Sequence, residues 1–301
     1  MPPIGEISLS KMTHDVPLSI ILPAKNEAAS LVTLLPELKQ QVPEAEILVV
    51  DDGSTDDTAA LCKLHQVRVV SQPYCMGNGA AVKAGARAAS GEVLVFMDAD
   101  GQHRPEDIPL LLEKLDQGFD MVVGARGKGS QANIHRSIGN KIYNRLASWM
   151  VGHRIVDLTS GFRAARADKF KQFLYLLPNG FSYPTTITMS FFRAGYGVAY
   201  VLIHAPKRIG GSHLRLVKDG LRFLLIIFKI GSLYSPLKLF APAAFLHFIL
   251  GIGYYAFTFA TDHRLSSMTV FLLSASVTIF MIGLVSEQIT ALMYKDSAGH
   301  E

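Results

Sequence analysis

The chain of 301 residues contains little cysteine and little charge. Its two cysteines, Cys62 and Cys75, cannot make a disulfide framework in a chain of this length, and no metal-type cysteine spacing accompanies them. A reducing compartment is therefore expected. Charged residues make up 18% of the chain, against about 25% in a typical soluble domain, and the mean hydropathy is +0.26. This composition excludes a disordered chain and predicts roughly two domain-sized units, one of which does not lie in water.

Residues 1–17 lack the apolar stretch of a secretory signal, so we expect a loose leader there. The formal net charge of +4 is concentrated further along the chain. Lys and Arg number 20 against 20 Asp and Glu in residues 1–202, seven against one in 203–238, and two against four in 239–301. The basic segment consists of Lys207, Arg208, Arg215, Lys218, Arg222, Lys229 and Lys238, with Asp219 as its single acid.

Charges recur at helical spacing from Leu214 to Ile230, with Leu, Ile and Phe between them. This pattern favours an interfacial amphipathic helix lying in the headgroup plane, within a basic juxtamembrane region 214–238. An amphipathic helix packed on its own domain is the alternative.

Two long stretches without formal charge follow, Leu239–Thr261 and Leu265–Ser286. Each slightly exceeds the ~20 residues that a helix needs to cross hydrocarbon, and the three residues between them allow only a tight hairpin. A pair of buried core helices is the alternative. Because basic residues favour the cytoplasmic side, we expect an integral membrane protein of a bacterial-type inner membrane, with its main domain, both termini and a tail 287–301 in the cytoplasm.

The first two hundred residues alternate apolar runs with helical patterns, which predicts an α/β fold with a mostly parallel sheet. No Gly-x-Gly-x-x-Gly follows the first strand, and no Gly-Lys-Ser/Thr phosphate loop occurs. If the ligand of this domain carries a diphosphate, a metal ion and arginine must therefore hold it. Strands are predicted at 18–22, 46–50, 67–70, 93–97, 121–123 and 198–203. Helices are predicted near 28–40, 55–65, 79–89, 105–117 and 183–194.

Three polar clusters directly follow predicted strands: residues 23–27, 51–56 and 98–102. In an open α/β sheet the ligand crevice lies outside the carboxyl ends of the strands, so we expect one site built from all three. Asp98 and Asp100 are spaced to approach a divalent cation, Mg²⁺ or Mn²⁺, that is shared with substrate phosphates; a solvated turn with helix-capping acids is the alternative. Asp52 is free to accept from ribose hydroxyls or a base N–H. Glu27 suits either the nucleotide or the dipole of the following helix.

These residues together resemble the family 2 glycosyltransferases of the GT-A fold, and within them the polyisoprenyl-phosphate glycosyltransferases related to dolichyl-phosphate mannose synthase. The resemblance runs through most of residues 18–215 and implies a GT-A nucleotide-sugar-binding domain at 18–213. The segments that carry it are 23–27, 50–54, 98–102, Gly124-Ala125-Arg126, Thr159-Ser160-Gly161-Phe162-Arg163 and Arg208-x-x-Gly211-Ser212.

The resemblance also implies roles for individual residues. The nucleotide is lined by Pro23, Lys25, Glu27, Val50 and Asp52. Metal and diphosphate are held by Asp98, Ala99, Asp100 and Gln102. The phosphate of the lipid acceptor is met by Arg126, Arg136, Ser137 and Arg163. The donor is closed over by Arg208 and its neighbours, including His213, which stands where relatives often carry Lys; Cys75 stands where they often carry Asn.

The implied reaction is inverting transfer of a sugar from a nucleotide-diphosphate sugar, of the GDP-mannose or UDP-glucose type, to a polyprenyl phosphate. A lipid phosphate is mostly a dianion at neutral pH and hardly needs a general base. For Asp157 two roles are open: it either stabilises the developing oxocarbenium or orients a sugar hydroxyl, or it pairs with Arg163. The partners are donor, lipid acceptor and bilayer, with no nucleic acid; a homo-oligomer is left open.

A processive polysaccharide synthase is the nearest rival function, but its Gln-x-x-Arg-Trp motif is missing around the single tryptophan, Trp149. A non-catalytic membrane-bound interaction subunit is the second rival, and a nucleotidyltransferase would need a Gly- and Lys-rich loop that is missing.

Overall fold

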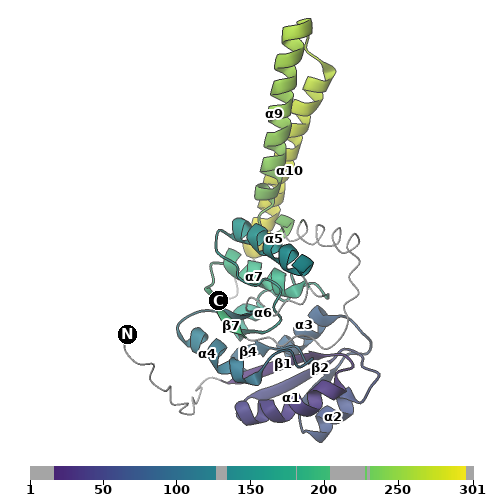
Figure 1. Ribbon diagram of the computed structural model, residues 1–301, viewed down its shortest axis with the longest axis vertical. Helices are drawn as coiled ribbons and strands as arrows, with labels where there is room; N and C mark the ends of the chain where they lie inside the picture. The colour runs from purple at the N-terminus through teal and green to yellow at the C-terminus, as the bar shows by residue number, and fades with distance from the viewer. Residues whose placement is uncertain (1–16, 127–133, 181, 204–227, 229–230, 296–301) are drawn as a thin grey trace.

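The computed structural model describes residues 17–126, 134–180, 182–203, 228 and 231–295. It has two parts, an α/β domain and a long pair of antiparallel helices that rises from one side of it (Figure 1). The fold confirms the predicted α/β class with a mostly parallel sheet.

A seven-stranded sheet forms the centre of the domain, in the order β3-β2-β1-β4-β6-β5-β7. All its pairings are parallel except those of β6 with β4 and β5. The six predicted strands are present, whereas β6 was not predicted. The strands are β1 (Leu18–Ala24), β2 (Glu46–Asp51), β3 (Arg68–Ser71), β4 (Val93–Phe96), β5 (Met121–Arg126), β6 (Arg163–Arg166) and β7 (Val198–Ile203).

Helices cover both faces of this sheet, because its central strands carry apolar side chains on both sides. On one face Ile20 and Val49 pack with α1 and α4, and on the other Ile21 and Leu48 pack with α3 and α7. Of the helices, α5 and α6 were not predicted. The domain's helices are α1 (Ala28–Gln41), α2 (Thr58–Leu64), α3 (Asn78–Ala88), the 3₁₀ turn η1 (Pro105–Asp107), α4 (Ile108–Asp116), α5 (Ile134–Val151), α6 (Ala167–Lys171) and α7 (Tyr183–Arg193).

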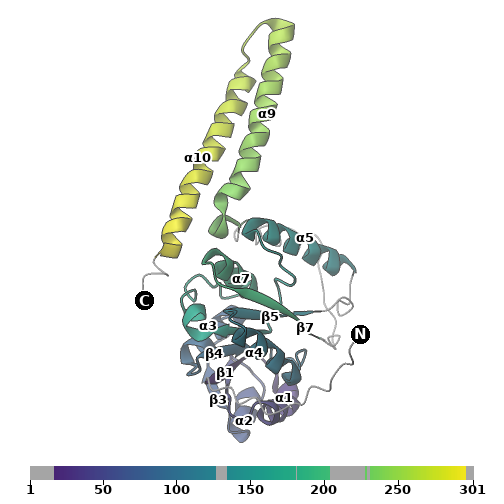
Figure 2. The ribbon, with the colours of Figure 1, turned by 90° about the vertical axis from the view of Figure 1, so that its left-hand side faces the viewer.

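The two remaining helices, α9 (Pro236–Asp262) and α10 (Ser267–Lys295), form the predicted hairpin (Figure 2). Only 11% and 17% of their most apolar windows are buried, which argues against the alternative of buried core helices. Small residues lie where the helices meet: a Cβ at Gly251 would lie 2.8 Å from Leu273 Cδ2, and Ser276 Oγ donates to Ala244 O at 2.8 Å. Such close approach is typical of helix pairs in membranes.

The lower end of α10 extends nine residues beyond the predicted span and packs against the α/β domain. Glu287 Oε1 lies 3.3 Å from Arg193 Nη2 of α7, and its Oε2 accepts from the Leu237 N–H at the start of α9 at 3.2 Å. Tyr294 Oη is 3.2 Å from Ser190 Oγ. The hairpin and the domain are thus joined through side chains as well as through the connecting chain. The predicted interfacial helix 214–230 lies, apart from Phe228, outside the described residues.

Candidate active site

The three polar clusters meet at one edge of the sheet, as predicted. Ala24 is paired with Asp51 at the ends of β1 and β2, and the Met97 N–H after β4 donates to Ile21 O of β1 at 3.1 Å. The chain order reverses between β1 and β4, which is the topological switch point where open α/β sheets bind their ligands.

The first two clusters interlock through side-chain hydrogen bonds. Asn26, which has a positive φ of 56°, accepts at Oδ1 from the Thr55 N–H at 2.7 Å, and its own N–H donates to Ser54 Oγ at 2.9 Å. Glu27 lies at the start of α1, where its carboxylate accepts from Ser30 Oγ at 3.2 Å and is favoured by the helix dipole. The loops that line this side of the crevice therefore hold each other in place.

Asp52 anchors the loop that carries Cys75. Its carboxylate accepts from the Met76 N–H at 2.6 Å and the Gly77 N–H at 3.0 Å, and it is only 4% exposed. Its expected contact with a ribose or base stays a prediction. The exposed Lys25 lies beside it, and contact with the Cys75 thiol, with the Asp52 charge behind it, raises the pKa of Lys25.

Asp98 and Asp100 are half-buried, while Ala99 between them turns inward and is 2% exposed. The Asp98 carboxylate fits against Gly161, where a Cβ would lie 2.6 Å from Asp98 Oδ2. His103 Nε2 is 3.6 Å from the same oxygen, and no Lys or Arg lies within ion-pair distance of Asp98 in the described chain.

This arrangement fits a divalent cation. No cluster of three or more His, Cys, Asp or Glu side chains occurs among the described residues, so two carboxylates would share the ion with a diphosphate. That is the usual manner of Mg²⁺, which takes one or two carboxylates together with substrate phosphates. Gln102, half-buried, follows in the same turn, and its N–H donates to Asp100 Oδ1 at 3.1 Å.

Asp157 pairs with Arg126, and not with Arg163 as one of our two readings had it. Arg126 Nε and Nη2 lie 2.8 and 3.1 Å from the two Asp157 oxygens, and Nη2 also donates to Thr159 Oγ1 at 2.6 Å. Burial would raise the pKa of Asp157, but the hydrogen bond and charge of Arg126 outweigh it and lower that pKa. Asp157 therefore stays ionised and holds the Arg126 guanidinium. The charge of Asp98 also interacts favourably with this guanidinium.

Arg163 does not reach an acceptor phosphate, which corrects its predicted role. Its side chain is completely buried in β6, where Nη1 donates to Pro184 O at 3.1 Å and Thr188 Oγ1 at 3.2 Å, and Nη2 to Ser160 O. Carbonyl and hydroxyl oxygens thus accept from both terminal nitrogens of this guanidinium, while its Nε is buried without a hydrogen-bond partner among the described residues. These bonds tie β6 to α7.

The side chains of Val50 and Ala99 belong to the two hydrophobic cores and are 0% and 2% exposed, so a contact of either residue with the donor would be made by its backbone. Pro23, at the end of β1, is half-buried. Arg136 and Ser137 fall in α5, but their side chains are not described, and Arg208 and His213 lie outside the described residues.

His103 and Phe162 belong to the site and were not singled out from the sequence. Their rings stack at a centroid distance of 5.1 Å, and His103 Nδ1 is buried without a hydrogen-bond partner in the described chain. His103 lies three residues beyond Asp100, and this proximity in the sequence could have pointed to it as a site residue. Phe162 supports the ring from behind, and Gly124 N–H donates to Phe162 O at 2.9 Å.

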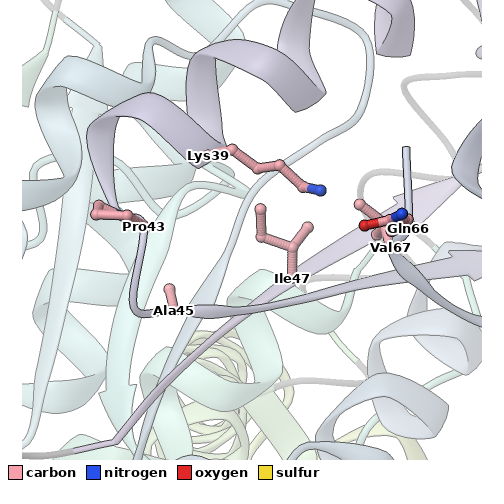
Figure 3. A pocket seen from close by; sticks show the side chains of 6 residues that line it. All are labelled: Lys39, Pro43, Ala45, Ile47, Gln66 and Val67. Atoms are coloured by element: carbon pink, nitrogen blue, oxygen red, sulfur yellow. The ribbon is translucent and has the colours of Figure 1, made fainter.

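A hollow of about 350 Å³ lies away from this site, at the amino ends of β2 and β3 (Figure 3). It is lined by Lys39, Pro43, Ala45, Ile47, Gln66 and Val67. Lys39 donates from Nζ to the His65 carbonyl, and the lining is otherwise apolar or amide. It therefore offers no chemistry comparable with that of the carboxyl edge.

Comparison with known families gives two matches that together cover most of the chain. Residues 19–174 match the model described as glycosyl transferase family 2, and residues 235–292 match the GtrB C-terminal hairpin. The first match contains the three polar clusters, Arg126 and Asp157.

Individual proteins resemble the chain over the same parts. The polyprenol monophosphomannose synthase of Mycolicibacterium smegmatis is 30% identical over 65% of this chain and 82% of its own length. An undecaprenyl-phosphate 4-deoxy-4-formamido-L-arabinose transferase of Klebsiella pneumoniae is 35% identical over 50% of this chain and 48% of its own. Glucosyl-3-phosphoglycerate synthase of Mycobacterium tuberculosis, crystallised with Mn²⁺, UDP-glucose and phosphoglyceric acid, shares the fold with a TM-score of 0.58 at 22% identity, over 72% of this chain and 79% of that one.

Proposed function

The chain belongs to glycosyl transferase family 2, and from that premise we propose that it transfers a sugar from a nucleotide-diphosphate sugar to the phosphate of a polyprenyl phosphate at the cytoplasmic face of a membrane. The observation that carries the proposal is that Asp98, followed by Asp100, lies near enough to the guanidinium of Arg126 to interact with its charge, on a domain joined to an apolar helical hairpin.

The donor binds on the side formed by the ends of β1, β2 and β4. Lys25, Glu27 and the loop anchored by Asp52 border the nucleotide, and Asp98 and Asp100 would hold a divalent ion together with the diphosphate. A divalent ion, Mg²⁺ or Mn²⁺, would neutralise the charge that develops on the leaving diphosphate. The interlocked loops 26–28 and 54–58 keep this half of the crevice in one shape.

The acceptor binds on the side formed by β5 and the 157–161 segment. Arg126 is 28% exposed, and its Nε and Nη2 are held by Asp157 and Thr159, which leaves Nη1 to meet an anion. Arginine suits this task because its guanidinium is always positively charged. The resemblance assigns Arg136 and Ser137 to the acceptor phosphate as well, and this assignment stays part of the proposal.

The lipid phosphate then attacks the anomeric carbon from the face opposite to the diphosphate. The new bond joins phosphate oxygen to carbon, the bond to the nucleoside diphosphate breaks, and the configuration inverts, so an α-linked donor gives a β-linked product. Asp157 keeps Arg126 in place during this step, because its carboxylate accepts hydrogen bonds from the Arg126 guanidinium and from the Thr159 N–H.

Relatives named for mannose and for 4-deoxy-4-formamido-L-arabinose leave the sugar open, and we propose a hexose of the GDP-mannose or UDP-glucose type. Both ends of the hairpin lie on the side of the domain, so the domain and the end of α10 share one side of the membrane. The excess of basic residues in 203–238 supports a cytoplasmic position for that side.

The test is a panel of nucleotide sugars offered to the full chain in vesicles that contain a polyprenyl phosphate, with Mn²⁺, with Mg²⁺ or with chelator. We expect one donor to yield a lipid-linked sugar with inverted configuration by NMR, and no product in chelator. Full turnover in chelator, or retained configuration, would overturn the proposal.

A further inference from the structure

Helix α5 carries a second basic surface that the charge totals conceal. Residues 121–156 contain six Lys and Arg residues and not one Asp or Glu, although residues 1–202 as a whole are balanced. Three of these six bases lie in α5 itself. The segment therefore carries a local positive charge that no acidic residue within it balances.

The exposed and buried residues of α5 lie on opposite sides of the helix. Lys141, Arg145 and Trp149 are exposed and follow one another at intervals of four, so they form one stripe. Tyr143 and Met150 are 5% and 3% exposed and lie roughly opposite, at 100° per residue. We call residues 141, 145 and 149 the α5 stripe.

The buried side of α5 is held on the domain, so the α5 stripe faces away from it. Tyr143 Oη donates to Thr185 Oγ1 of α7 at 2.9 Å, and Met150 packs with Met189 of α7 and with Tyr234. Both ribbon views show α5 on the side of the domain from which the hairpin rises, and Figure 2 shows it lying across the direction of the hairpin. The stripe thus points toward the side where a membrane would lie.

The height of α5 relative to the hairpin also matches a membrane surface. About 20 helical residues cross the hydrocarbon, so counting back from Thr261 near the tip puts the inner boundary of the hydrocarbon near residue 241. Lys238, three residues earlier and roughly 5 Å lower, donates from Nζ to Met150 O of α5 at 2.9 Å. The carboxyl end of α5, where Trp149 is 50% exposed, is therefore at headgroup level.

We propose that the α5 stripe lies in the headgroup layer of the bilayer that the hairpin spans, with Lys141 and Arg145 on anionic lipid headgroups and Trp149 at the boundary with the hydrocarbon. Basic residues on one face with a tryptophan at the interface are the features of a helix that lies on a membrane. The inference depends on the hairpin crossing a membrane and not on the proposed chemistry. Because α5 contains Arg136 and Ser137, a docked α5 would also place the acceptor side of the crevice against the lipid.

Trp149 is the single tryptophan of the chain, so its fluorescence reports on this surface without any substitution. The full chain is reconstituted into vesicles of phosphatidylcholine and phosphatidylglycerol, and carbonate extraction first establishes that the hairpin is inserted. Emission is then measured with lipids spin-labelled near the headgroup, with lipids labelled deep in the chain, and with acrylamide. The control is Trp149→Phe combined with Leu64→Trp, since Leu64 is 79% exposed on α2, at the far end of the domain.

We expect shallow labels to quench Trp149 more than deep labels, and acrylamide to quench it less than the control tryptophan. The double variant Lys141→Gln/Arg145→Gln should reduce the shallow quenching at least about twofold in anionic vesicles, with little change in vesicles without phosphatidylglycerol. Quenching by acrylamide as strong as in the control, without lipid quenching, would overturn the proposal by placing the stripe in water. Protection from both lipid labels and acrylamide would overturn it in favour of a protein contact, such as a second copy of the chain.

Discussion

In the α/β domain the apolar side chains lie inside, whereas in the hairpin they lie outside. Ile20 and Leu94 are 0% exposed, but Phe245 and Phe257 are each 63% exposed. Some polar side chains of the hairpin lie inside, since Thr269 and Ser276 are 0% and 6% exposed. The apolar surface of the hairpin is what a part that lies in lipid requires.

This difference between the two parts indicates which of them carries the reactive groups. In the domain, polar groups that cannot enter the core gather at the carboxyl edge of the sheet, where they can act on a soluble donor. In the hairpin, Ser276 and Thr290 are buried and donate hydrogen bonds to backbone carbonyls, so we expect the hairpin to contribute position and not chemistry. Substitutions should therefore separate into those that stop transfer and those that only move or loosen the domain.

The largest effect is expected at the paired carboxylates. Asp98→Asn and Asp100→Asn should each lower the rate of sugar transfer by about 10³-fold or more, because the diphosphate loses its bound ion. Membrane insertion should not change. The measurement is product formation at saturating donor, and Asp168→Asn, an exposed residue of α6, is the matched control. Activity within tenfold of the unsubstituted chain would refute this assignment.

A smaller loss is expected when Arg126 is replaced. Arg126→Lys keeps the positive charge but loses the two-point pairing with Asp157, so kcat/KM for polyprenyl phosphate should fall by roughly 10²-fold. The dissociation constant of the nucleotide should change little. Arg87→Lys on α3 is the control, and an equal loss of donor and acceptor binding would contradict the acceptor role.

Gly161→Ala tests the space around Asp98. The new Cβ would lie 2.6 Å from Asp98 Oδ2, so the carboxylate must turn and Mn²⁺ should bind about tenfold more weakly. Mn²⁺ titration followed by electron paramagnetic resonance in the presence of nucleoside diphosphate gives this affinity directly. Gly180→Ala, where nothing lies within 4 Å, should leave the affinity unchanged. If both variants bind Mn²⁺ equally, the cradle at Gly161 has no role.

Glu287→Gln tests the junction between the two parts. The variant loses the partly buried ion pair with Arg193, worth about 1 kcal/mol, while the amide can still accept from the Leu237 N–H. Transfer should fall only a few fold, and hydrogen exchange should rise in α7 and at the start of α9. Glu113→Gln on the exposed face of α4 should do neither. Unchanged exchange in Glu287→Gln would show that this contact does not join the parts.

The smallest effect concerns stability alone and is confined to the domain. Burial raises the pKa of Glu46, but hydrogen bonds from Ser19, Ser90 and Arg68 outweigh it and lower that pKa to about 2. Because the folded pKa lies below the ordinary 4.5, the stabilisation is complete above pH 4.5 and is lost as the pH falls toward 2. Glu46→Gln should therefore lower the Tm of the domain by about 2–4 °C at pH 7 and by less at pH 3. A constant difference across this pH range would contradict the account.

The spacing of apolar residues was sufficient to predict features that belong to a single strand or helix. The buried runs, the polar clusters that follow them and the uncharged hairpin are all visible in the order of residues. The strand β6 was not, because its sequence Arg-Ala-Ala-Arg has no apolar run, and only the oxygens of α7 and Ser160 make a buried Arg163 tolerable.

Contacts between residues far apart in the sequence could not be predicted either. Asp157 lies 31 residues from Arg126, and Asp52 meets a loop 24 residues away, so their roles depend on how segments are brought together. Helix α5 was not predicted, although its buried positions 143, 147 and 150 are helically spaced. Its exposed stripe became meaningful only once the hairpin was seen to rise beside it.

The central claim is tested most directly by comparing two acceptors that differ in one group. The full chain in vesicles receives its donor sugar with Mn²⁺ and either a polyprenyl phosphate or the corresponding polyprenol. The account predicts one sugar per molecule of polyprenyl phosphate and none on polyprenol, because Arg126 recognises the phosphate and no residue is assigned to deprotonate an alcohol. Equal transfer to polyprenol, or a polymer of sugars on either lipid, would contradict it.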